Sequence, residues 1–154
     1  MTHVHNIMFR GLNSIYLQAP HVQPEDYDSF CHYMQLWYTW LHAHHEGEEA
    51  ILFPGIERLS GEKGIMEANV EQHRAFHDGL DAFGKHCDAL VADPSKFDGQ
   101  QVIQLIDAFG LTLTQHLTEE IDTLLGLRRF GEEKMKDVLK IAAEEAGTVM
   151  VRYY

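Results

Sequence analysis

The 154-residue sequence has few cysteines, few basic residues and no long apolar run. Its two cysteines, Cys31 and Cys87, form no CxxC pair, which argues against a zinc finger or a disulfide framework and favours a reducing compartment. Acidic residues outnumber basic ones by 24 to 12, and the formal charge of -12 argues against nucleic acid or an anionic membrane as a partner. Because the sequence shows no signal peptide and no run of about 18 apolar residues, we predict a cytoplasmic protein.

Histidine is the residue present in excess, with 11 copies in a chain of this length. A hydrophobic content of 45% is enough to build a core, so residues 1–154 are expected to form a single domain. An excess of histidine calls for a chemical explanation, and metal binding or proton transfer are the two that fit an imidazole side chain.

Four prolines, at positions 20, 24, 54 and 94, divide stretches that have helical periodicity and few strand signals. The first helix is expected to end before Pro20, and Pro24 is expected to open the second, with two acidic residues in its first turn. The predicted helices cover residues 3–18, 24–53, 65–91, 100–127 and 132–146. Their lengths and short connections predict an all-α fold, an up-down four-helix bundle over residues 2–127 with an additional C-terminal helix.

Histidines and carboxylates interrupt the apolar stripe of each long predicted helix. The candidate metal ligands are His5, His44, Glu48, His73, His77, His116 and Glu120. Burying such groups without partners costs on the order of 1–3 kcal/mol each, so a shared metal partner is the simpler explanation. Two alternatives stay open, because the start of the first helix is indistinct and a second stripe is also apolar. These are His3 in place of His5, and the pair His45 and Glu49 in place of His44 and Glu48.

The spacing of these donors favours two metal ions. Residues four apart lie on one face of a helix, so a His-x-x-x-Glu pair can bind one ion by the imidazole and reach a second by the carboxylate. Imidazole and carboxylate suit iron, manganese or zinc, and seven donors exceed the four of a structural zinc site. The HExxH zinc motif is excluded, since Arg74 stands where its glutamate belongs.

The donors and their neighbours resemble a known family. Residues 44–54 read HHEGEEAILFP, followed by HxxxH at residues 73–77 and HxxxE at residues 116–120. Over residues 2–127 this pattern is similar to the hemerythrin-like, or HHE cation-binding, domain, and residues 10–18 resemble its fungal members. The resemblance implies a bundle with a non-haem di-iron centre that reacts with O2. It implies that His73, His77 and His116 bind one iron, that His5 and His44 bind the other, and that Glu48 and Glu120 bridge them.

One departure from the family pattern bears on function. In the oxygen-carrying members the last carboxylate is an aspartate five residues after its histidine, whereas here Ile121 takes that position and Glu120 stands four residues after His116. The chain therefore resembles the broader cation-binding branch, which includes sensors and enzymes. We predict a protein that binds two Fe ions, with Mn or Zn as alternatives, and takes up O2 or a related small ligand as monomer or homodimer. The alternative is a di-iron oxygenase or oxidase acting on a small organic substrate.

Overall fold

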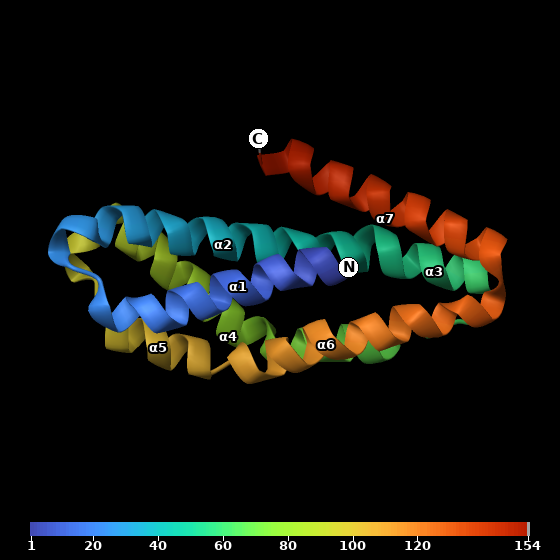
Figure 1. The fold of residues 1–154 in the computed structure, drawn as a ribbon, viewed down its shortest axis with the longest axis horizontal. Coiled ribbons are helices and arrows are strands. Elements are labelled where there is room, and N and C mark those ends of the chain that lie inside the picture. Colours follow the sequence, from blue (N-terminus) through green and yellow to red (C-terminus); the bar gives the residue numbers. More distant parts are fainter. Residues whose placement is uncertain (154) are drawn as a thin grey trace.

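The computed structural model describes the backbone of residues 1–153 and the side chains of residues 1–144 and 147. Within residues 1–153 the chain forms helices and no strand. The longer helices are α1 (Thr2–Gln18), α2 (Tyr27–Gly47), α3 (Phe53–Ser60), α4 (Glu67–Ala92), α5 (Gly99–Asp107), α6 (Gly110–Gly126) and α7 (Glu132–Tyr153). The predicted all-α bundle with an additional C-terminal helix is confirmed (Figure 1).

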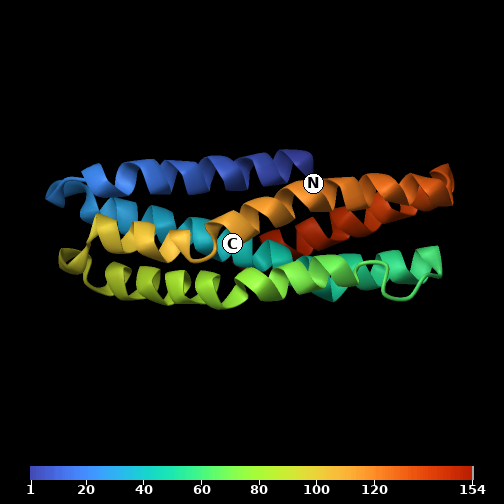
Figure 2. The same ribbon diagram turned by 90° about the horizontal axis from the view of Figure 1, so that it is seen from below.

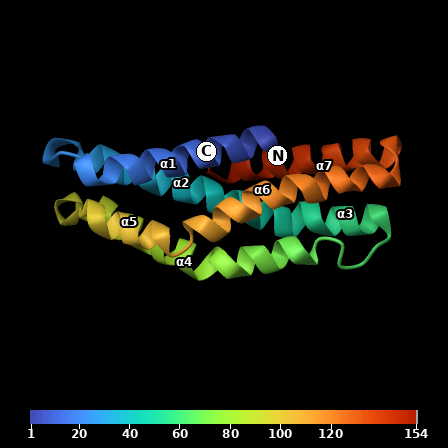
Figure 3. The ribbon, with the colours of Figure 1, turned by 60° about the horizontal axis from the view of Figure 1, so that its bottom comes forward.

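The helices lie roughly along one common axis, and the views in Figures 2 and 3 show how they share its length. Helices α2 and α3 form one continuous rod, α4 runs back beside it, and α5 and α6 return along the molecule. Helix α1 covers the half of the bundle where α2 begins, while α7 folds back against the other half, beside α3. The N-terminal end of α1 therefore reaches the middle of the bundle.

The predicted end of the second helix at Pro54 is wrong, because the rod continues to Ser60. A π-helical turn, η3 (Glu48–Leu52), precedes α3, and the Phe53 N–H donates across it to the Glu48 carbonyl. Proline has no N–H to donate, so a helix can pass through it only where the hydrogen-bond ladder is locally rearranged. Here the proline stands in the first turn of α3, directly after the widened turn, and the helix then ends at Gly61, whose φ of 76° is left-handed.

The predicted continuous helix over residues 100–127 is also wrong, since it is broken between α5 and α6. Phe109 leaves the helical region with a φ of -132° and places its ring, 1% exposed, in the core. The ring centroid lies 5.8 Å from that of Phe83 on α4, and Gly79 packs so closely against Phe109 that a side chain there would clash. The break therefore lets α5 and α6 each present their own apolar face to the bundle.

Two apolar clusters fill the bundle, one on each side of its middle. The larger one includes Met8, Leu41, Phe76 and Leu117, and lies on the α1 side. The smaller one includes Leu52, Phe53, Leu127 and Val138, so α7 supplies part of its wall. The buried polar side chains belong to neither cluster and lie on the helices between them. Among the described residues, no helix is long and apolar enough to cross a bilayer.

Candidate metal centre

The middle of the bundle holds a group of buried imidazoles and carboxylates from four helical rods. Its members are His5 on α1, His44 and His45 on α2, Glu48 on η3, His73 on α4, and His116 and Glu120 on α6, all at most 7% exposed. Donor atoms of His45, Glu48, His73 and His116 lie within 4.8 Å of one another, and so do those of His5, His44 and Glu48. Glu48 belongs to both groups, so a single carboxylate joins them.

The structure brings together six of the seven residues that the sequence predicts as metal ligands. They are His5, His44, Glu48, His73, His116 and Glu120. The alternative His3 is exposed on the outer face of α1. The ligand role of the six stays a prediction, but their convergence is what that role requires.

His77 is the predicted ligand that the structure does not place in the group. Its side chain is 59% exposed and lies 3.7 Å from Asp78 and 3.9 Å from Asp81 on the outer surface of α4. The buried stripe of α4 passes from His73 to Phe76 and Leu80, so Phe76, at 3% exposed, takes the inward position. A helix has 3.6 residues per turn, so a residue four positions further on points slightly past the direction of the first. On α4 this rotation places His77 outside the core-facing stripe.

His45 is buried in addition to His44, although the sequence presented the two as alternatives. Successive helical residues point about 100° apart, and α2 packs against both α1 and α4. The His44 ring faces that of His5 at 5.6 Å, whereas the His45 ring faces His73 at 4.6 Å and His116 at 5.2 Å. The apolar stripe through His45 was the sequence signal for this position.

Hydrogen bonds to the outer ring nitrogens fix the tautomers of His5 and His73. His5 Nδ1 lies 2.7 Å from the Leu117 carbonyl oxygen, and His73 Nδ1 lies 2.8 Å from Glu49 Oε1. A carbonyl and an ionised carboxylate only accept hydrogen bonds, so each Nδ1 must carry the proton. Because burial lowers the pKa of His73 to about 4, its ring is neutral at pH 7, and its Nε2 is the unprotonated nitrogen that points into the group.

The same reasoning fixes His116 through the side chain of Gln72. Gln72 Nε2 donates to Glu119 Oε2 at 2.5 Å, and this bond orients the amide because a carboxylate cannot donate. Gln72 Oε1 therefore faces His116 Nδ1 at 3.1 Å and accepts its proton. No pattern in the sequence pointed to Gln72, because its partners are 44 and 47 residues away.

The inward nitrogens of these rings face other acceptors at short distance. His73 Nε2 lies 3.0 Å from His116 Nε2, and His5 Nε2 lies 3.1 Å from Glu120 Oε2. The lone pairs of the neutral His73 and His116 rings face each other in this arrangement and repel unless a cation lies between them. Donors at neighbouring corners of an octahedral ion, with bonds of about 2.1 Å, stand about 3 Å apart, so the spacing fits a metal. Neither nitrogen of His45 has a hydrogen-bond partner among the described residues, and a metal ion would give one of them a partner.

The electrostatics of the group favour a metal over shared protons. Burial lowers the pKa of His73 to about 4. Burial, followed by the neighbouring His73 ring, lowers the pKa of His116 to about 3. Burial also lowers the pKa of His45 well below its ordinary value. These imidazoles are neutral at pH 7, which is the form that binds metal ions.

Comparison with known proteins finds a matching family and a curated relative. The family model described as hemerythrin HHE cation binding domain matches residues 1–127. A curated relative, "Dimeric xanthone biosynthesis cluster protein R11" from Cryptosporiopsis sp. (strain 8999), is 35% identical over 139 residues. The alignment covers 90% of this chain and 52% of the relative, so the chain spans about half of that protein's length. No solved structure matches.

Proposed function

The chain belongs to the hemerythrin HHE cation-binding domain family, and from this premise we propose that it is a non-haem di-iron protein that binds O2 or a related small ligand. In this proposal three imidazoles, those of His45, His73 and His116, hold one ion. The imidazoles of His5 and His44 hold the other. Glu48 and Glu120 supply the carboxylates that the two ions share. Relative to the family pattern, His45 replaces His77.

The observation that carries the proposal is the position of Glu48. This carboxylate is fully buried, with Oε1 at 2.9 Å from His44 Nε2 and Oε2 at 3.6 Å from His73 Nε2. Its two oxygens thus reach one imidazole of each group. Positive charge stabilises a buried carboxylate, and the low pKa values of His73 and His116 mean that those two imidazoles are neutral. A pair of divalent cations supplies that charge.

The choice of iron rests on the donor set. Five imidazoles and two carboxylates suit divalent iron by ligand type. Held by these residues, a ferrous pair would supply one electron from each ion to a small ligand. Because neutral imidazoles contribute no charge, they favour the ferrous state more than a carboxylate-rich set does. The protein's own part is to hold the imidazoles neutral and in place.

Aromatic rings around the group restrict what can reach it. The Phe76 ring lies 5.0 Å from that of His45 and 5.5 Å from that of His116, and the Phe53 ring lies 5.5 Å from that of His73. Both phenylalanines are at most 3% exposed, so they exclude bulk water from this side of the group. Such a lining favours a ligand of a few atoms.

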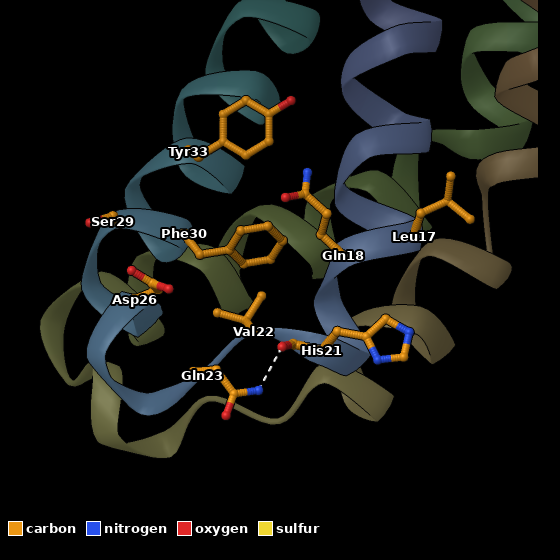
Figure 4. A pocket seen from close by; sticks show the side chains of 9 residues that line it. All are labelled: Leu17, Gln18, His21, Val22, Gln23, Asp26, Ser29, Phe30 and Tyr33. Atoms are coloured by element: carbon orange, nitrogen blue, oxygen red, sulfur yellow. Dashed lines mark hydrogen bonds between the residues drawn. The ribbon is translucent and has the colours of Figure 1, made fainter.

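A second candidate function is a di-iron oxygenase or oxidase acting on a small organic substrate. The printed name of the Cryptosporiopsis relative places that protein in a biosynthesis cluster, and this favours an enzyme. Against it, a hollow of about 450 Å³ lies away from the group, between the end of α1 and the start of α2 (Figure 4). Tyr33 lines that hollow and precedes His44 by 11 residues of α2, or about 16 Å of helix.

Metal analysis combined with gas uptake tests the proposal. Protein reconstituted with iron and reduced without oxygen should hold two iron ions per chain and should take up O2 that is released again under vacuum. Zinc-loaded protein is the control and should take up none. Two zinc or manganese ions in protein purified from iron-replete cells would contradict the iron assignment. Irreversible O2 consumption that accelerates with an added aromatic compound would favour the enzyme.

A further inference from the structure

The hydrogen-bond partners on the outer side of the group are not equivalent. His5 donates to a backbone carbonyl, that of Leu117, and His116 donates to the amide oxygen of Gln72. Both of these acceptors are neutral. His73 instead donates to a carboxylate, that of Glu49. Among these three outer contacts, the one to His73 is thus the charged one.

The local backbone explains how Glu49 reaches His73. Glu48 and Glu49 are the first two residues of the π-helical turn η3, and they point to different sides of the rod. Glu48 is fully buried, whereas the Glu49 side chain is 46% exposed and crosses to α4, where its Oε1 lies 2.8 Å from His73 Nδ1. His73 itself is 4% exposed, so the carboxylate at the edge of the bundle acts on a buried ring.

A charged acceptor changes the ring that donates to it. A hydrogen bond to an ionised carboxylate is roughly twice as strong as one between neutral groups. It holds the ring in one orientation, keeps the proton on Nδ1 and makes the opposite nitrogen a better electron-pair donor. For His73 that opposite nitrogen is Nε2, which faces His116 Nε2 at 3.0 Å inside the group.

We propose that Glu49 is a positioning residue for His73, and that it strengthens metal binding selectively at the ion held by His45, His73 and His116. The inference rests on the two-ion site of the proposed function, but it does not require that the metal be iron. The Glu49 carboxylate touches no metal in this proposal, and its effect passes through the imidazole of His73. The ion held by His5 and His44 lacks such a charged outer partner on His5 and is bound independently of Glu49.

Zinc titration of metal-free protein against a chromophoric chelator tests the selectivity. Glu49→Ala should lower the zinc affinity of one of the two sites by about 10–100-fold and leave the other unchanged, as outer hydrogen-bond partners of metal-bound histidines commonly do. Glu49→Gln, which keeps the shape without the charge, should lower the same site by a smaller factor. Glu46→Gln is the matched control, because Glu46 lies on the same rod and pairs with His42 on the outer surface at 3.7 Å. It should change neither site.

Nitrogen-15 spectra of the histidine rings separate positioning from a general structural role. In metal-free wild-type protein His73 should carry its proton on Nδ1, and in Glu49→Ala it should become a mixture of tautomers. The thermal midpoint of the metal-free protein should not change. A His73 ring protonated on Nε2 in the wild type, or an equal loss at both zinc sites in Glu49→Ala, would overturn the proposal.

The test also separates this inference from the proposed function. If the native metal is not iron, the metal analysis will contradict the proposed function. The zinc selectivity and the tautomer of His73 will nevertheless be as expected. If the site holds one zinc ion per chain in every variant, the two-ion site itself is refuted. If two zinc ions bind and Glu49→Ala binds both as tightly as wild type, the role of Glu49 alone is refuted.

Discussion

Replacing His45 by alanine separates the site seen in the structure from the one that the HxxxH spacing suggests. His45 is 7% exposed and its two buried ring nitrogens have no hydrogen-bond partner among the described residues, whereas the His77 side chain is 59% exposed. We expect His45→Ala to reduce bound metal from two ions per chain to one. We expect His77→Ala to keep both.

The size of the effect follows from linkage between metal binding and folding. Losing a direct ligand should weaken the affinity by at least the 100-fold at the upper end for outer partners, which lowers metal-linked stability by about 2.7 kcal/mol. In a domain of this size about 1 kcal/mol corresponds to about 2–4 °C, so the thermal midpoint should fall by about 5–10 °C. His77→Ala is an exposed substitution and should change stability by less than about 0.5 kcal/mol.

The metal-free proteins provide the internal control. Without metal, truncating His45 opens a cavity, which destabilises, but it also removes buried nitrogens that lack partners, which cost about 1–3 kcal/mol. These effects oppose each other, so the difference between wild type and His45→Ala should be much smaller without metal than with it. The assay is differential scanning calorimetry with and without bound metal, beside elemental analysis. Equal metal loss in both variants, or full metal content in His45→Ala, would refute the assignment of His45.

Two further predictions concern the packing around the site. Burial raises the pKa of the Cys87 thiol to about 12 and also raises that of Cys31. At pH 8 about one Cys87 in ten thousand is therefore a thiolate, and neither cysteine should react with Ellman's reagent until the protein is unfolded. Because the folded pKa of Cys87 lies above its unfolded value, its contribution to stability is complete below about pH 9 and is lost as the pH rises towards 12. Gly84→Ala should destabilise the fold by about 1–3 kcal/mol in urea titrations, because the new methyl group would overlap the Tyr38 ring. Gly126→Ala, also helical but with open space beside it, should not destabilise; a loss equal to that of Gly84→Ala would contradict this explanation.

The fold class was predictable because the apolar periodicity is local information. Four long stretches between a few prolines indicated four rods, and α1 and α4 begin and end within about two residues of the predicted bounds. The errors occurred where long-range packing overrides a local signal. Pro54 reads as a helix end, yet the rod passes through it after a π turn. Residues 108 and 109 read as helix, yet Phe109 turns into the core against α4.

The candidate site was predictable from the same local periodicity, but only approximately. Periodicity places a residue on the inner or outer face only to within about one position, because each residue rotates by about 100° and the roll of a helix about its axis is set by its neighbours. Because of this uncertainty, the sequence predicted His77 at a position where the structure buries Phe76. For the same reason it presented His44 and His45 as alternatives, although both are buried. The outer partners were beyond reach, since Glu49 and His73 are 24 residues apart and lie on different rods.

The helical bundle and the interruption of its apolar faces by imidazoles and carboxylates could be predicted from the sequence alone. Both follow from the order of side chains along a helix, which needs no knowledge of any neighbour. The assembled fold was needed to learn which donors meet, that Glu48 joins two groups of them, and which oxygen atoms face the outer nitrogens of His5, His73 and His116. These features depend on the relative rotation of separate rods, and that rotation is fixed by the packing of their apolar surfaces.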